Sequence, residues 1–250
     1  MTNGCEKKFE RFFGIPVDKC GQVLIISPFF GAKLFSAQLN RACDFKGMLF
    51  HGVSGMYEEK KVTFINTGMG QTFTADCVLA QNAQKIKAII FLGAVGALQD
   101  LNISQGVLIQ EAFFDSDFFS ELGLLSRQDQ ALRFGPDPEL SIISRRIASE
   151  QKYELEPARV ISINTLWQQE PESARPFINR GMQAVDLECA FLYAAAARKK
   201  IKTAALCYVS DHLIEKPFWT DFPPTERSSL QNAMKKLAEI ALKITARISE

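Results

Sequence analysis

The chain alternates between short, nearly continuous apolar runs and longer segments in which apolar residues recur at helical spacing. The short runs are rich in Val, Ile and Leu, which is typical of strands buried on both faces of a sheet. They span residues 22–29, 61–68, 88–96, 106–114, 159–164 and 203–211. The pattern therefore predicts strands at these places.

Helical patterns lie between the predicted strands. They cover residues 31–39, 72–83, 137–151, 188–200 and 227–249. Strands that alternate with helices indicate an α/β fold with a largely parallel sheet. We see no linker, repeat or low-complexity segment in the 250 residues, and we therefore expect a single domain over 1–250.

Composition and charge narrow the class of partner. The formal net charge is +1 at pH 7, and acidic and basic residues are mixed along the chain. This balance argues against nucleic acid or an anionic membrane surface as a partner. The N-terminus lacks the apolar stretch of a signal peptide, and no apolar run is long enough to span a bilayer. We expect a cytoplasmic protein that binds a small molecule.

Cysteine and histidine usage gives no sign of a metal or of a disulfide framework. The six cysteines are scattered at positions 5, 20, 43, 77, 189 and 207, and none forms a Cys-x-x-Cys pair. The only histidines are His51 and His212. We therefore expect neither a metal site nor a cofactor.

Three of the predicted strands end in distinctive residues: "NTGMG" at 66–70, "GAVGA" at 93–97 and "SDH" at 210–212. Ligands of open α/β sheets bind beyond the carboxyl ends of the strands. Glycine at such an end lets the backbone approach a ligand closely, although each of these glycines could equally serve only a turn.

Two carboxylates stand in apolar surroundings. Asp211 ends an apolar strand, where it is either a helix cap or a general acid that partial burial keeps protonated. Glu188 lies near the start of an Ala-rich helix. It is either a favourable charge at a helix N-terminus or an acceptor for two neighbouring hydroxyl groups. Spacing alone leaves both alternatives open.

Residues 184–213, "AVDLECAFLYAAAARKKIKTAALCYVSDHL", resemble the nucleoside phosphorylase and nucleosidase superfamily. Members of that family carry a Val-Glu-Met-Glu helix start and then an apolar strand that ends in Ser-Asp. Residues 46–70, 87–98 and 225–234 resemble further stretches, and Ser-Asp-His points to the hexameric, bacterial-type purine nucleoside phosphorylases. The resemblance implies a three-layer α/β/α sandwich with a mixed, partly barrel-like central sheet. It also implies a homo-oligomer: a dimer, trimer or hexamer.

The resemblance implies cleavage of the N-glycosidic bond of a purine nucleoside. Glu188 matches the glutamate that holds the ribose hydroxyls, and Asp186 matches the weaker-acting glutamate before it. Asp211 matches the aspartate that protonates purine N7, and Arg227 matches the arginine that pairs with that aspartate. The remaining positions matched to substrate packing are Met69, Leu166, Trp167 and Leu187.

The positions that match the family's phosphate site depart from its pattern. Gly31 and Phe91 stand where the family has arginines, Ser27 stands where it has a glycine, and Ala94 stands where it has a serine. Arginine reads phosphate through paired hydrogen bonds, which a phenyl ring cannot replace. Lys46 matches an arginine that the family donates across a subunit interface.

Three hypotheses remain for the function of the chain. The chain is a hydrolase, a phosphorylase with phosphate as co-substrate and an anion site rebuilt around Lys46, Lys33 and Ser27, or a nucleoside-binding protein that has lost catalysis. A hydrolase would need another base or a weakly activated water, since the glutamate that the family's nucleosidases use is absent from residues 26–39. We place catalysis first, because a binding protein has no need for a proton donor.

One further expectation concerns the former phosphate pocket. Phe29, Phe30 and Phe91 are expected to line it and to make it apolar.

Overall fold

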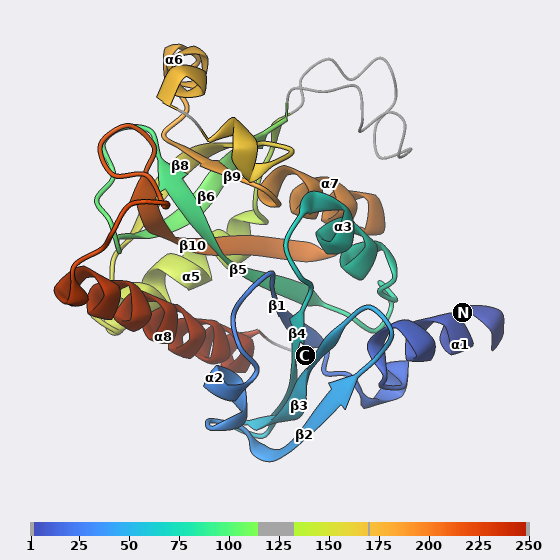
Figure 1. Ribbon diagram of the computed structural model, residues 1–250. Coiled ribbons are helices and arrows are strands. Elements are labelled where there is room, and N and C mark those ends of the chain that lie inside the picture. The colour runs from blue at the N-terminus through green and yellow to red at the C-terminus, as the bar shows by residue number, and fades with distance from the viewer. Residues whose placement is uncertain (1–2, 115–132, 170, 249–250) are drawn as a thin grey trace.

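The computed structural model describes residues 3–114, 133–169 and 171–248, and its centre is one mixed sheet between helices (Figure 1). Four parallel neighbours form the middle of the sheet in the order β4 (Lys60–Asn66), β1 (Val23–Ser27), β5 (Ala88–Ala97) and β10 (Lys202–His212). Their carboxyl ends therefore lie at one edge.

A second route of strands closes part of the sheet into a barrel. It runs from β10 through β6 (Gly106–Phe113), β8 (Leu155–Ser162) and β9 (Ala184–Asp186) back to β5. Because β10 also pairs directly with β5, these five strands form a ring. The short strand β7 (Arg133–Phe134) pairs with β6.

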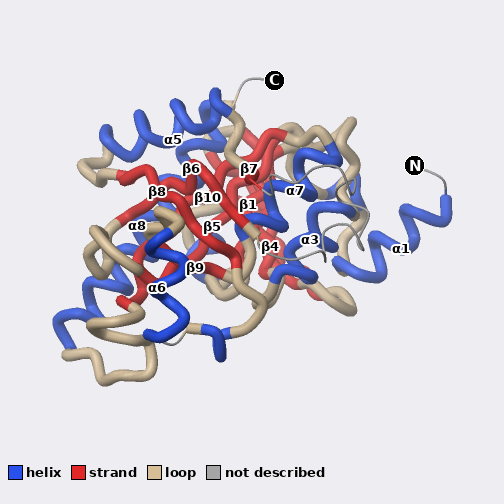
Figure 2. Tube along the Cα trace, turned by 90° about the horizontal axis from the view of Figure 1, so that it is seen from above, coloured by secondary structure: helices blue, strands red, loops and turns tan. Residues whose placement is uncertain are grey.

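Helices cover both faces of the sheet, which makes the three layers (Figures 1 and 2). One core cluster joins the sheet to α1 (Asn3–Phe13), α3 (Gln71–Leu79) and α7 (Cys189–Lys199). A second core cluster joins the other face to α2 (Lys33–Ser36), α5 (Pro138–Glu150) and α8 (Pro224–Arg247). Strand residues alternate between the clusters, since Leu24 and Ile26 face the first and Val23 and Ile25 the second.

Three smaller elements complete the described chain. They are the 3₁₀ turns η1 (Val17–Lys19) and η2 (Leu166–Gln168) and the helix α6 (Pro171–Asn179). Helix α6 contributes Ala174 to a third, small apolar cluster with Val185 and Leu213, near the carboxyl ends of β9 and β10. None of the helices in the described ranges is long and apolar enough to cross a membrane.

The architecture expected from the resemblance is confirmed, but the prediction of a largely parallel sheet is wrong. Among the described residues, five strand pairings are parallel and five are antiparallel. All six predicted strands are present, although β8 begins earlier, at Leu155. The predicted helix 31–39 shortens to Lys33–Ser36.

Two of the antiparallel pairings, β2–β3 and β3–β4, form a hairpin extension that apolar runs do not predict. Strand β3 (His51–Tyr57) joins β4 through Glu58 and Glu59, and both of these residues have positive φ. Two-residue hairpin loops of this kind usually contain Asn or Gly. The edge strand β2 (Asn40–Lys46) is mostly exposed and therefore carries no apolar run.

Tyr193 of α7 joins two barrel strands where their ladder ends. The last backbone pair in this direction is Leu206 with Leu108. Beyond it, the Tyr193 hydroxyl donates to the carbonyl oxygen of Ile109 at 2.8 Å and accepts from the amide of Ala205 at 3.1 Å. The hydroxyl thus replaces the next rung of the ladder.

We predict that Tyr193→Phe lowers the free energy of unfolding by about 2 kcal/mol, because it leaves a buried amide and a buried carbonyl without a partner. Urea denaturation measures the change. Tyr57→Phe is the matched control, since the structure gives the Tyr57 hydroxyl no hydrogen bond among the described residues. Equal stability of the two variants would contradict the bridging role.

Candidate active site

A cavity of about 230 Å³ opens at the carboxyl ends of β5, β9 and β10. Three carboxyl groups reach it, those of Asp186, Glu188 and Asp211. Its apolar lining includes Phe29, Met69, Leu166, Leu187 and Phe218. The structure thus brings together residues that lie far apart along the chain.

Asp186 caps the helix that carries Glu188. One carboxylate oxygen of Asp186 accepts from the backbone amides of Glu188 at 2.9 Å and Cys189 at 2.5 Å. Glu188 is the residue at the N-cap position of α7 and makes no cap bond with its own side chain. Asp186 therefore supplies the acceptor that the first amides of the helix require.

The Glu188 side chain turns toward the Gly-Met-Gly loop. Its Oε1 accepts from the backbone amide of Gly70 at 2.7 Å. Gly70 has a φ of 108°, which favours glycine at this close approach. Burial, together with the charge of Asp186, raises the pKa of Glu188 to about 8, and the Gly70 amide opposes that rise.

Asp211 lies at an irregularity in β10, where the register with β5 shifts between Val209 and Asp211. Its Oδ1 is 2.5 Å from the Ser210 hydroxyl, whereas its Oδ2 is buried without a hydrogen-bond partner among the described residues. Burial raises the pKa of Asp211. A Cβ on Gly96 would stand 2.5 Å from Leu213 and 3.4 Å from Oδ2, so glycine keeps space beside this carboxyl.

Two residues matched to the site lie elsewhere. Trp167 is 86% exposed and does not line the cavity. Arg227 is exposed in the first turn of α8, and its Nε donates to the carbonyl oxygen of Phe222 at 2.7 Å. The expected Asp211–Arg227 pair is therefore not formed in the structure.

The residues matched to the phosphate site are also not gathered around one cavity. Phe91 is 1% exposed in the core beneath α3 and α7, and Gly31 is exposed. The Ser27 hydroxyl accepts from the amides of Phe29 and Phe30. Ala94 lines the cavity, while Lys46 is exposed at the end of β2.

The expectation for the three phenylalanines is thus wrong for two of them. Only Phe29 lines the cavity, because Phe30 and Phe91 are fully buried in the two cores on opposite faces of the sheet. Alternation along β5 explains the position of Phe91, since Ile89 and Phe91 face one core while Ile90 and Leu92 face the other.

Sequence reasoning missed Ser162 and Ser210, the serines that bond to the two aspartates. Ser162 ends β8, and its hydroxyl is 2.5 Å from Asp186 Oδ1. The predicted strand 159–164 extends past Ser162, so the pattern does not mark this serine as a strand end. No group of three or more His, Cys, Asp or Glu side chains in the described ranges could hold a metal ion.

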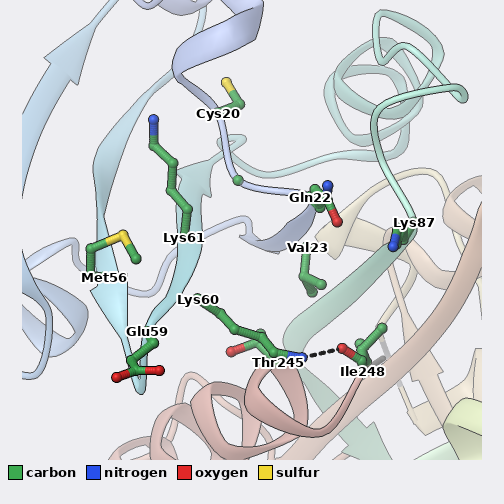
Figure 3. A pocket seen from close by; sticks show the side chains of 11 residues that line it. Cys20, Gln22, Val23, Met56, Glu59, Lys60, Lys61, Lys87, Thr245 and Ile248 are labelled. Atoms are coloured by element: carbon green, nitrogen blue, oxygen red, sulfur yellow. Dashed lines mark hydrogen bonds between the residues drawn. The ribbon is translucent and has the colours of Figure 1, made fainter. Parts of the chain in front are cut away.

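A larger cavity of about 350 Å³ lies at the opposite edge of the sheet, at the amino ends of β1 and β4 (Figure 3). It is lined by Lys60, Lys61 and Lys87 among others, and Lys60 donates to the carbonyl oxygen of Ile248. None of the predicted site residues lines it. Size alone therefore does not identify the candidate site.

The class of protein follows from comparison with known families. Residues 24–248 match the family described as the Phosphorylase superfamily. The match covers most of the chain, and the protein belongs to this superfamily of enzymes.

Individual relatives agree with that assignment. The DeoD-type purine nucleoside phosphorylase of Clostridium perfringens is 26% identical over 204 residues, 80% of each chain. The DeoD-type enzyme of Caldanaerobacter subterraneus is 24% identical over 208 residues, 80% of this chain and 82% of that one.

A solved structure shows the same fold. It is the 5′-methylthioadenosine/S-adenosylhomocysteine nucleosidase of Campylobacter jejuni, with a TM-score of 0.77 and 15% sequence identity. The alignment covers 91% of this chain and all of that one.

We predict that Glu188→Gln stabilises the free protein increasingly as pH rises. Below about pH 4.5 the carboxyl is protonated in both the folded and the unfolded state. Between there and about pH 8 the folded protein retains a proton that the unfolded chain releases, so stability falls with rising pH. The glutamine does not ionise, so the free energy of unfolding of Glu188→Gln should exceed that of the wild type by on the order of a few kcal/mol at pH 8.

Thermal unfolding from pH 5 to pH 9 measures this difference in parallel with Glu150→Gln, an exposed site at the end of α5. A difference between Glu188→Gln and wild type that stays constant over this range would contradict the prediction.

Proposed function

We propose that the protein cleaves the N-glycosidic bond of a purine nucleoside. The observation that carries the proposal is the pair of buried carboxyl groups on one cavity, Glu188 held by Gly70 and Asp211 with one unpartnered oxygen. Superfamily membership and the purine nucleoside phosphorylase relatives support the same chemistry.

Asp211 is the proposed acid. Breaking the bond places negative charge on the base and oxocarbenium character on the sugar, so a proton delivered to the base lowers the barrier. Burial favours the protonated carboxyl, and the Ser210 hydroxyl occupies Oδ1. A proton carried by this carboxyl would therefore lie on Oδ2, where purine N7 would accept it.

Glu188 is the proposed ligand of the ribose hydroxyls. The Gly70 amide fixes Oε1, and an ionised carboxylate has further lone pairs for the 2′- and 3′-hydroxyls. Those bonds favour the charged form that burial disfavours in the free protein. Met69, Leu166 and Leu187 supply apolar contacts at the same cavity.

Water is the proposed acceptor. None of the described residues that line the cavity is Lys or Arg, whereas three carry carboxyl groups. Phosphate is an anion, and this lining supplies no cation to balance its charge away from bulk water. Water is neutral, and an oxocarbenium-like sugar is a strong electrophile.

We predict that base release proceeds at the same rate with and without phosphate. Inosine, adenosine and guanosine are incubated with the purified protein in both buffers, and chromatography separates base, free ribose and ribose 1-phosphate. Free ribose in both buffers is the expected result. Ribose 1-phosphate formed only with phosphate would contradict hydrolysis and favour an anion site that uses Lys46 of a neighbouring copy.

We predict that Asp211→Asn lowers kcat at least about 100-fold, as expected for the loss of a general acid. Inosine affinity, measured by calorimetry, should change only a few-fold because the contacts to the sugar remain. Asp221→Asn, in the exposed loop before α8, is the control. Full activity in Asp211→Asn would remove the acid assignment. Inosine binding without turnover in the wild type would instead favour the nucleoside-binding alternative.

Assembly is part of the proposal. The resemblance implies a homo-oligomer, and several large apolar side chains are exposed, including Met48, Phe73 and, at the cavity, Met69. By the same resemblance, Lys46 would be donated to the cavity of a neighbouring copy.

A further inference from the structure

We propose that Ser162 is a positioning residue for Glu188, acting through Asp186. The inference rests on the proposed function for the role of Glu188, and its geometry stands independently of the reaction. Ser162 ends β8 and Asp186 ends β9, and the two residues are direct neighbours in the parallel ladder.

The two side chains form one buried hydrogen-bonded unit. The Ser162 hydroxyl donates to Asp186 Oδ1 at 2.5 Å and accepts from the backbone amide of Ala190 at 2.9 Å. Asp186 Oδ2 accepts from the amides of Glu188 and Cys189. Ser162 is 1% exposed and Asp186 3% exposed, so water does not compete for these bonds.

This arrangement changes the role that the resemblance implies for Asp186. Both of its carboxylate oxygens are already engaged by groups of the protein. A sugar hydroxyl would have to compete with a serine hydroxyl and two backbone amides. Asp186 therefore acts on the substrate through Glu188 and not as a ligand of the sugar.

The unit fixes where Glu188 lies. Three successive amides at the start of α7, those of Glu188, Cys189 and Ala190, all bond to Asp186 or Ser162. These amides have no acceptor within the helix, and the helix is buried along Cys189–Ala196. The backbone of Glu188 is thus tied to β8 and β9 while its carboxyl reaches the Gly70 amide.

Ser162 is the donor that keeps Asp186 in this orientation. Without the hydroxyl, Oδ1 loses its serine donor and Ala190 loses its acceptor. The carboxylate of Asp186 is then held at Oδ2 by the amides of Glu188 and Cys189 but no longer tied to β8, so the start of α7 shifts relative to the Gly70 loop. Loss of the hydroxyl should therefore weaken the hydrogen bonds that Glu188 makes more than it lowers the stability of the fold.

The first test uses discrimination between ribose and deoxyribose. Calorimetry gives the affinities of inosine and 2′-deoxyinosine for the wild type and for Ser162→Ala. We expect the preference for inosine to fall about tenfold in Ser162→Ala, as for the loss of one charge-assisted hydrogen bond. Ser162→Thr keeps the hydroxyl and should restore most of the preference.

The second test needs no ligand. Amide hydrogen exchange by NMR reports the bond from the Gly70 amide to Glu188, and Ser162→Ala should speed exchange at Gly70 about tenfold without changing the amides of β1. Ser144→Ala is the matched control, because Ser144 is fully buried in α5 and its hydroxyl has no partner among the described residues. If Ser162→Ala does not fold, Ser162→Cys, with its weaker donor, replaces it.

The outcomes separate the two proposals. Unchanged discrimination and unchanged Gly70 exchange in a destabilised Ser162→Ala would show that Ser162 only supports the fold, which overturns the inference. If the wild type binds neither nucleoside, the proposed function fails, while Gly70 exchange still decides whether Ser162 positions Glu188.

Discussion

The site depends on one constraint: a helix that begins in a buried place must find acceptors for its first amides without water. In this protein the acceptors come from the ends of two neighbouring strands, Ser162 on β8 and Asp186 on β9. The barrel closure sets β8 beside β9, and β9 beside β5. The same ring of strands brings Asp211 of β10 to the cavity that Glu188 lines. The strand pairings that close the barrel therefore also place the residues of the site.

Burial raises the pKa of both Asp211 and Glu188, and this favours the proposed role of the first but opposes that of the second. For Asp211 it favours the protonated state, which is the state that a general acid needs. For Glu188 it raises the pKa to about 8, although a sugar diol is bound best by the ionised form. Substrate hydroxyls would supply the missing stabilisation, since hydrogen bonds to a carboxylate lower its pKa. The free protein thus holds Glu188 in a state that costs stability, as is common at sites selected for binding.

Much of the fold could be predicted from apolar runs, because buried parallel strands such as β1, β5 and β10 consist of little else. The β2–β3 extension could not, since β2 is exposed and the turn at Glu58 and Glu59 lacks the usual residues. For the site, the family pattern singled out Glu188 and Asp211, and both line the cavity. It does not reveal that Arg227 bonds to Phe222 or that Ser162 holds Asp186, because contacts between distant segments depend on packing and not on local pattern.

The position of Phe91 bears on the proposed choice of water as acceptor. The resemblance aligns this residue with a phosphate-binding arginine, yet its ring packs over Gly93 in the core beneath α3 and α7. A Cβ on Gly93 would meet that ring at 2.5 Å. An arginine at position 91 would have to bury a charge in apolar surroundings or displace the neighbouring strand. Either change costs several times the free energy that one surface ion pair contributes. Introducing an arginine at this position would therefore require repacking of the core around β5 and not only a single substitution.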